Sequence, residues 1–220
     1  MINFEDIKNS NEIKTYISKA DESLISLGYT EHSFAHVTKV ATVANEILAK
    51  LGEYDERTLE LASIAGYMHD IGNVVNRVDH AQSGAIMAFR ILDKMGMDVS
   101  EIAKVISAIG NHDESTAVPV NEVAAAIIMA DKSDVRRSRV RNRDFATFDI
   151  HDRVNYSVEH SSLNLDVNKK EIALNLTIDT KICAVMDYFE IFLQRMLLCR
   201  RAAEFLKLRF KLIINDVELL

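Results

Sequence analysis

Four histidines and two aspartates recur along this chain in an order that restricts how it can fold, because together they can build a two-metal site. They are His36, His69, Asp70, His80, His112 and Asp131. Imidazole nitrogens and carboxylate oxygens without any cysteine suit Fe, Mn, Co or Zn better than a structural zinc knot. The sequence therefore predicts a metalloenzyme with one or two divalent transition metals per chain.

The composition favours a mainly helical protein. The chain has 220 residues, 48% of them hydrophobic, with one proline and seven glycines. Long stretches of Ala, Leu, Ile, Glu and Lys favour helices over a loop-rich sandwich or barrel. This length is enough for one domain, or for one domain with an appended module.

Charge and hydropathy narrow the expected partners and location. A net charge of -7 argues against a general nucleic-acid coat or a polybasic membrane protein. The first residues, 1–6, carry no basic region followed by an apolar run, so they do not read as a secretory signal. The apolar stretch 123–130 is too short to cross a bilayer. We expect a cytoplasmic protein with no membrane partner and no strong nucleic-acid signal.

Apolar residues recur at helical spacing in the first two thirds of the chain, and caps and glycines mark the ends of the helices. Helices are predicted over residues 2–27 (as one or two), 31–51, 55–70, 80–95, 99–109 and 120–132. All six candidate ligands fall on these helices or at their ends. Helix ends that project into a bundle interior commonly build metal sites.

The hydrophobic period changes after about residue 152. Alternating apolar residues predict a half-buried strand over 172–178, and shorter runs at 154–159 and 163–167 suggest a meander. A long amphipathic helix is predicted over 180–206, followed by a strand over 210–214. The predicted fold is thus a helical bundle in residues 1–150 with an α+β module of antiparallel strands and one long helix in residues 151–220.

The apolar face of the long C-terminal helix has two possible interpretations. Its apolar residues can pack on the sheet, or they can also support a homodimer. Cys183 and Cys199 both fall within this predicted helix, too far apart along it to form a disulfide, and we expect them to be buried thiols.

The adjacent pair His69 and Asp70 needs a helix end. Neighbouring residues on a helix point about 100° apart, so the two side chains can serve one centre only where the helix frays. Ile71 and Gly72 supply such an end, and His80 opens the next helix, where Gly84 would permit close helix approach.

The order His, His-Asp, His, His, Asp resembles the HD superfamily of metal-dependent phosphohydrolases. The resemblance covers roughly residues 30–140 and includes the motifs His-Asp-Ile-Gly at 69–72 and Ala-Asp-Lys at 130–132. It implies an HD-type helical bundle and phosphoester hydrolysis by metal-activated water.

The resemblance also implies roles for single residues. His36, His69, Asp70 and Asp131 would bind one metal, with His69 and Asp70 in catalytic positions. His80 and His112 would bind a second metal with Asp70 as the bridge. The alternative for this last pair is that His80 caps its helix and His112 lines the pocket.

The resemblance also implies substrate contacts at Asn73, Asp134 and Arg137, and it implies that Lys132 either contacts the substrate phosphate or anchors the loop. Asn73 stands where many family members have a lysine, so one positive phosphate contact is missing. Arginine binds phosphate well, and a run of arginines follows the last metal ligand, although a solvated face is the equal alternative. The run comprises Arg136, Arg137, Arg139, Arg141 and Arg143.

Four further residues resemble ligands but lie outside the motif. We expect Asp113 and the pair His151 and Asp152 to be surface or structural residues. His32, one turn before His36, could reach the mouth of the pocket, although we expect it to be exposed to solvent.

The leading functional expectation is a hydrolase that cleaves a phosphomonoester or phosphoanhydride, with a phosphorylated small molecule, a nucleotide, as its partner. Two alternatives remain. Some relatives with the full histidine-rich set are mixed-valent di-iron oxygenases, and a metal-dependent nucleotide-sensing module is also compatible with the pattern.

Overall fold

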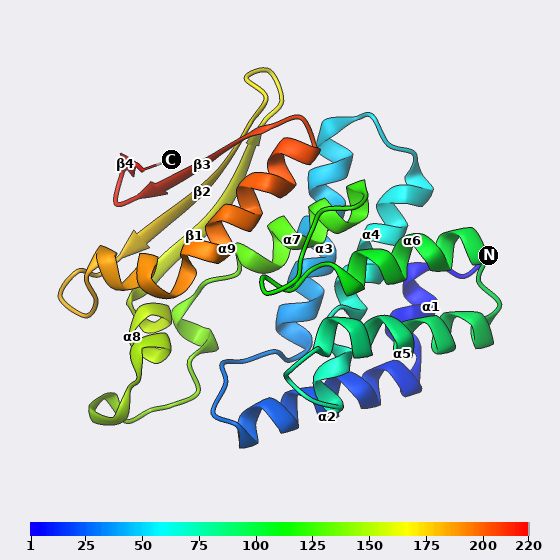
Figure 1. Cartoon of the computed structure of the whole chain (residues 1–220), viewed down its shortest axis with the longest axis horizontal. Coiled ribbons are helices and arrows are strands. Elements are labelled where there is room, and N and C mark those ends of the chain that lie inside the picture. The colour runs from blue at the N-terminus through cyan, green and yellow to red at the C-terminus, as the bar shows by residue number, and fades with distance from the viewer. Residues whose placement is uncertain (220) are drawn as a thin grey trace.

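Helices build most of the molecule. The computed structural model describes residues 1–219, so Leu220, the last residue of the predicted C-terminal module, lies outside the described residues. Helices α1 to α7 form one part of the chain, and a sheet with α8 and α9 forms the other (Figure 1). The bounds of the first part are α1 Phe4–Asn9, α2 Asn11–Ser26, α3 Phe34–Leu51, α4 Glu56–Met68, a 3-10 helix Ile71–Val74, α5 His80–Met95, α6 Val99–Gly110 and α7 Glu122–Lys132.

Local capping explains where these helices begin and end. The Asp55 side chain accepts a hydrogen bond from the backbone N–H of Thr58 at the start of α4. Gly52 and Gly96 adopt left-handed φ angles of 70° and 83° after α3 and α5, which glycine does without strain. The predicted helices of the first part are therefore confirmed, with small shifts at their ends.

Helix α7 lies in the interior of the helical part. Every residue from Val123 to Ala130 is buried, and α3, α4, α6 and α9 pack against this helix. A helix that is apolar on all sides belongs in a core, and its position brings its last turn, with Asp131 and Lys132, into the interior. In the part of the chain that the structure describes, no helix is both long and apolar enough to cross a membrane.

A close backbone contact joins the end of α4 to the start of α5. A Cβ atom added to Gly72 would lie 2.0 Å from the carbonyl oxygen of His80 and 2.4 Å from the backbone nitrogen of Gly84. Only glycine permits this approach. The contact holds the segment after His69 and Asp70 against the first turn of α5, and so brings His80 toward that pair.

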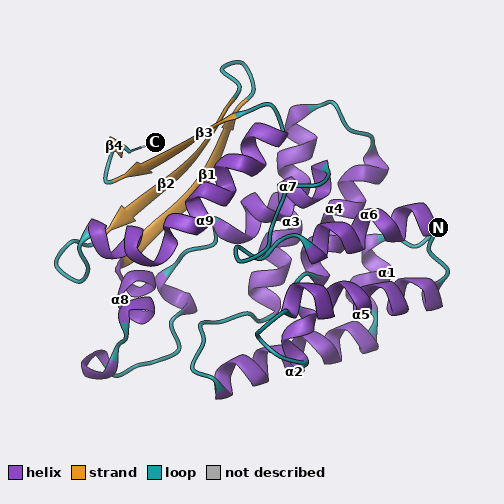
Figure 2. Cartoon of the chain, in the orientation of Figure 1, coloured by secondary structure: helices purple, strands orange, loops and turns teal. Residues whose placement is uncertain are grey.

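The C-terminal part is a four-stranded sheet with two helices, and the strands are confined to this end of the molecule (Figure 2). Its elements are the 3-10 helices Arg137–Arg139 and Phe145–Thr147, α8 Ile150–Ser157, β1 Val158–Asp166, β2 Glu171–Ile178, α9 Val185–Phe205, β3 Arg209–Ile214 and β4 Val217–Glu218. The strand order is β1-β2-β3-β4. Helix α9 packs against both β3 and α7, and so attaches the sheet to the helical part.

Three details of the sequence prediction are wrong. Strands β2 and β3 pair in parallel, not antiparallel, because α9 crosses over between them and returns the chain to the same end of the sheet. Residues 154–157 belong to α8, whose N-cap Asp149 accepts a hydrogen bond from the Asp152 backbone. Cys183 precedes α9, although both cysteines are buried as expected. The domain boundary at residue 150 stays a prediction.

Replacing Gly72 with alanine should destabilise the protein. The added methyl group would overlap two backbone atoms that cannot move independently of α5, and overpacking of this kind costs about 1–3 kcal/mol. Urea unfolding of Gly72→Ala against wild type measures the change. Gly110→Ala is the matched control, because its added Cβ would meet only the Ala85 Cβ at 3.6 Å. Equal free energies of unfolding for wild type and Gly72→Ala would contradict the close contact.

Candidate metal centre

Five helix ends bring the six predicted ligands together. His36 lies in the first turn of α3 and Asp131 in the last turn of α7, while His80 is the first residue of α5. His69 and Asp70 follow α4, where the backbone leaves helical geometry at Asp70 (φ -98°, ψ 0°). His112 follows α6. The frayed helix end that the sequence predicts for the His-Asp pair is confirmed.

One group of ligand atoms surrounds a common point. The Nε2 atom of His36 lies 3.2 Å from Asp131 Oδ1 and 3.7 Å from Asp70 Oδ2. The Nε2 atom of His69 lies 3.2 Å from Asp70 Oδ2 and 3.7 Å from Asp131 Oδ1. Two nitrogens and two carboxylate oxygens thus converge, which is a donor set that transition metals accept.

A second group uses the other oxygen of Asp70. Its Oδ1 atom lies 3.5 Å from His80 Nε2 and 3.9 Å from His112 Nε2. The two histidine nitrogens lie 3.2 Å apart. Each oxygen of the Asp70 carboxylate therefore faces one pair of histidines, which is the geometry of a bridging ligand.

Hydrogen bonds to the imidazole rings show which ring nitrogen carries the hydrogen and which carries the free lone pair. The Nδ1 atoms of His69, His80 and His112 lie 2.8, 3.0 and 2.6 Å from backbone carbonyl oxygens. A carbonyl can only accept, so each Nδ1 carries the hydrogen when the ring is neutral and each Nε2 offers a lone pair to the centre. The guanidinium of Arg77, which can only donate, lies 3.3 Å from His80 Nε2 in agreement with this tautomer.

The donor atoms fit divalent cations. Among the described residues, the buried Nε2 atoms of His36 and His69 have no hydrogen-bond partner. A buried nitrogen without a partner is costly, and a cation at the common point of the first group would satisfy both atoms. The first group would hold one ion with four protein atoms, and the second group would hold another with two imidazoles and the shared carboxylate.

Charge differs between the two groups. Burial works against ionisation of Asp70 and Asp131, but the neighbouring His69 and Lys132, respectively, hold the pKa of each carboxyl well below its usual range. Burial also works against protonation of His69, yet the nearby Asp70 and Asp131 raise its pKa to about 10. In contrast, burial and the neighbouring His69 lower the pKa of His112 to about 3. The first group is therefore anionic and attracts a cation strongly, while the second offers neutral imidazole.

Two predicted substrate contacts instead support the ligands. Asp134 is buried, and its Oδ2 atom accepts the Nδ1 hydrogen of His36 at 2.8 Å while Oδ1 pairs with Lys39 at 2.7 Å. The Asn73 amide donates to Asp70 Oδ1 at 2.9 Å. Neither residue lines the cavity described below. Such contacts fix the orientation of a ligand, so the structure gives both residues a positioning role.

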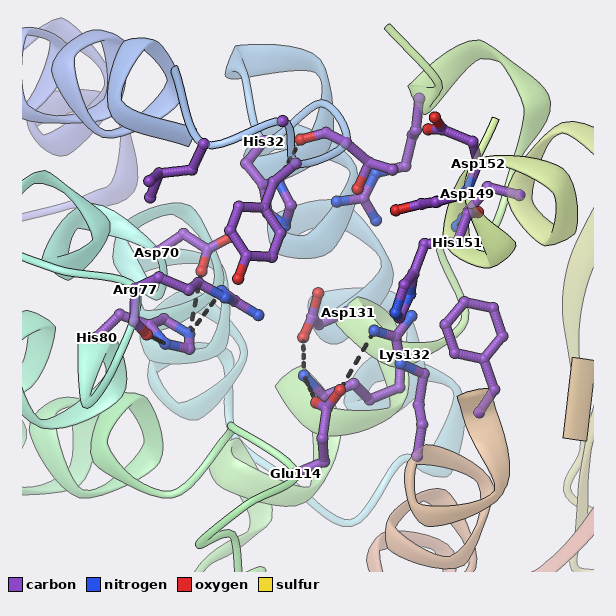
Figure 3. Close-up of a pocket in the computed structure, with 18 of the residues that line it drawn as sticks. His32, Asp70, Arg77, His80, Glu114, Asp131, Lys132, Asp149, His151 and Asp152 are labelled. Carbon is purple, nitrogen blue, oxygen red and sulfur yellow. Dashed lines mark hydrogen bonds and ion pairs between the residues drawn. The ribbon is translucent and has the colours of Figure 1, made fainter. Parts of the chain in front are cut away.

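A cavity of about 390 Å³ opens on the metal centre (Figure 3). Four of the predicted metal ligands, Asp70, His80, His112 and Asp131, line it. Figure 3 shows Asp149, His151 and Asp152 across the cavity from Asp70 and His80. The remaining lining includes Tyr29, His32, Arg77, Glu114, Lys132, Arg139, Asn155, Phe192 and Arg195.

The arginine run after Asp131 is divided between the cavity and other contacts. Arg137 does not line the cavity, because its Nε donates to the carbonyl of Tyr156 at 2.6 Å and its guanidinium lies 4.6 Å from the ring of that residue. The predicted phosphate contact of Arg137 thus has no counterpart in the cavity. Arg139, two residues later, does line it. Lys132 lines the cavity, 2.6 Å from Asp131 Oδ2, and its predicted contact with substrate phosphate stays a prediction.

Sequence reasoning misses several cavity residues. It gives no site role to His151 and Asp152 and expects His32 to be exposed, with the pocket mouth as the alternative. All three line the cavity, where His151 is exposed and His32 and Asp152 are half-buried. Their histidine and aspartate side chains are the available signal. Glu114 and Arg195 carry no motif, and only the packing of α9 against α7 brings Arg195 to this site.

Comparisons with known proteins agree with this geometry. The family model described as "HD domain" matches residues 33–191. An uncharacterized protein of Methanocaldococcus jannaschii is 28% identical, in an alignment that covers 64% of this chain and 62% of the relative. The chain thus spans less than two thirds of that relative's length. No solved structure matches the chain significantly.

Replacing single ligand residues should distinguish the two metal groups by the number of ions that the protein retains. Wild-type protein is expected to retain about two divalent ions per chain, as two-metal sites do. His80→Gln should retain about one, because His80 Nε2 faces only the second group. Asp70→Ala should lose both, because each of its oxygens faces one group. Metal analysis after gel filtration measures the stoichiometry, and two ions retained by His80→Gln would contradict the assignment.

Metal removal should also make stability depend on pH. The folded-state pKa of His69 is raised from 6.5 to about 10, so without metal its contribution is fully present below pH 6.5 and is lost as the pH rises toward 10. A bound cation replaces this proton. Chelated protein should therefore lose stability between about pH 7 and about pH 9, and metal-loaded protein should lose less. The melting temperature across this range is the measurement, and equal slopes in both samples would contradict the prediction.

Proposed function

The chain belongs to the HD domain family, a superfamily of metal-dependent phosphohydrolases, and from this membership and the geometry of its metal centre we propose that it hydrolyses a phosphomonoester or phosphoanhydride of a nucleotide. The observation that carries the proposal is the Asp70 carboxylate. Its two oxygens face two separate pairs of histidine nitrogens, beside a cavity large enough for a small molecule.

The residues that would hold the metals are the six of the two groups. His36, His69, Asp70 and Asp131 form the first group, and His80, His112 and the shared Asp70 form the second. The chemistry that two such cations supply is a lowered pKa of a coordinated water and neutralisation of charge on phosphoryl oxygens. Neutral imidazoles cancel none of the metal charge, and the two carboxylates alone would not neutralise two divalent ions, so positive charge would remain for an anionic substrate.

The cavity lining suits a substrate that carries phosphate. The side chains of Arg77, Lys132, Arg139 and Arg195 provide positive charge at the cavity, and guanidinium groups match the geometry of phosphate oxygens. The carboxylates nearest the metal groups, Asp70 and Asp131, remain ionised because their pKa values are held low against the effect of burial by neighbouring cationic groups. As ionised groups these two carboxylates can bind metal ions and do not supply protons to the substrate.

Aromatic rings at the cavity support a nucleotide as the substrate. Tyr29 and Phe192 both line it. The guanidinium of Arg77 lies 5.5 Å from the Tyr29 ring, and that of Arg195 lies 4.3 Å from the Phe192 ring. Rings beside guanidinium groups can contact a base and its phosphate at the same time.

A direct test is phosphate release from nucleotides. Metal-loaded wild type should release phosphate from at least one member of a panel of nucleoside mono-, di- and triphosphates, with Mn, Fe, Co or Zn added in turn. Asp70→Ala should reduce turnover to background, because both metal groups use that side chain. Asp93→Ala, an exposed aspartate on α5, is the matched control and should keep full activity.

Two results would contradict the proposal. Phosphate release by chelated protein would show that the metal centre is not needed. Oxygen consumption by the iron-loaded protein with no phosphate release from any nucleotide would favour the oxygenase alternative.

A further inference from the structure

One carboxylate joins two cations beside the metal centre. The Oε2 atom of Glu114 lies 2.7 Å from Lys132 Nζ, and its Oε1 atom lies 3.3 Å from Arg195 Nη2. Lys132 also lies 2.6 Å from Oδ2 of the metal ligand Asp131. Figure 3 shows Glu114 and Lys132 at the cavity next to Asp131. The chain therefore holds an anion between two cations at the wall of the cavity, directly beside the first metal group.

The two cations are fixed, and the anion is the less fixed partner. Lys132 ends α7, and its side chain is only 5% exposed. Arg195 lies within α9, and its guanidinium packs at 4.3 Å from the Phe192 ring. Glu114 belongs to the connection 111–121 between α6 and α7, and its side chain is 28% exposed. The helices thus hold the cations in place whichever anion lies between them.

A phosphate group matches these cations better than the glutamate does. Each cation contacts its own oxygen of the carboxylate, and a phosphate group presents further oxygens for the same two contacts. A phosphate monoester carries about -1.5 to -2 charges at neutral pH, whereas a carboxylate carries one. The pair of cations is therefore neutralised more completely by phosphate.

We propose that Lys132 and Arg195 form a phosphate-binding subsite beside the metal centre, and that Glu114 occupies this subsite until a phosphate group of the substrate displaces it. The inference rests on the proposed function, because the phosphate group belongs to the same substrate. It gives α9 a direct part in substrate binding through Arg195. It also makes Glu114 a selectivity residue, because a singly charged anion has little advantage over the carboxylate that it would replace.

The competing interpretation makes Glu114 a clamp that holds Lys132 and Arg195 in position. The two interpretations predict opposite signs. Removing a clamp loosens the cations and weakens phosphate binding, whereas removing a competing anion strengthens it. The conservative variant Glu114→Gln keeps the size of the side chain and removes its charge, and so distinguishes the two.

The test is calorimetric titration of inorganic phosphate into metal-loaded protein. Glu114→Gln should bind phosphate about tenfold more tightly than wild type, and Arg195→Ala about tenfold more weakly, because a charge-assisted hydrogen bond to phosphate changes affinity by about this factor. The matched control is Arg200→Ala. Arg200 lies on the same helix, is exposed, and pairs only at 4.0 Å with Glu204, so its variant should bind phosphate as wild type does.

Unchanged or weaker phosphate binding by folded Glu114→Gln would overturn the proposal and favour the clamp. If that variant does not fold, as judged by its melting curve, Glu114→Asp takes its place. Aspartate is one methylene group shorter, so its carboxylate should reach Lys132 and Arg195 less closely than Glu114 does. Phosphate binding should again tighten, and unchanged or weaker binding would again overturn the proposal.

Steady-state kinetics on a nucleotide that the protein hydrolyses distinguish a phosphate group of the substrate from free phosphate as the ligand of this subsite. Glu114→Gln should lower the KM for that nucleotide, and Arg195→Ala should raise this KM. Tighter binding of inorganic phosphate with an unchanged KM would overturn the assignment to substrate and leave a site for free phosphate. Because calorimetry needs no turnover, tighter phosphate binding without any hydrolysis would support the subsite while the proposed function fails.

Discussion

Two carboxylates at the metal centre, the buried Asp70 and the largely buried Asp131, are the constraint on which the rest of the structure depends. Burying an ionised carboxylate is unfavourable unless cations or hydrogen-bond donors surround it. Here four imidazoles, one ammonium group and the Asn73 amide do so. Those groups come from five different helix ends, so the charges can be compensated only when α3 to α7 are correctly packed.

The surrounding structure keeps these groups in place. Helix α7, buried from Val123 to Ala130, carries Asp131 and Lys132 toward the interior, and the glycine contact at Gly72 brings α5, with His80, against the end of α4. Asp134 and the carbonyls near the ends of α4 and α6 fix the imidazole rings so that Nε2 faces the centre. The C-terminal helices α8 and α9 complete the cavity. A metal ion would thus bind to a site that is already arranged.

Much of this could be predicted from the sequence because it depends on local rules. The 3.6-residue period, the Asp55 cap and the terminal glycines determine the helices. The side chains of His69 and Asp70 can face the same centre because the helix ends at this pair. What could not be predicted depends on packing between distant segments. Arg137 and Arg139 lie two residues apart in one short 3-10 helix, yet of the two only Arg139 lines the cavity. Arg195 reaches the cavity only because α9 packs on α7. The parallel pairing of β2 and β3 has the same origin, since it follows from the path of α9.

The most direct measurement of the bridging role of Asp70 is anomalous diffraction from crystals of the protein loaded with manganese. Two peaks about 3.5–4 Å apart are expected, one on each side of the Asp70 carboxylate, the first against His36, His69 and Asp131 and the second against His80 and His112. A single peak that Asp70 does not contact, or no peak near these residues, would contradict a two-metal centre bridged by this carboxylate.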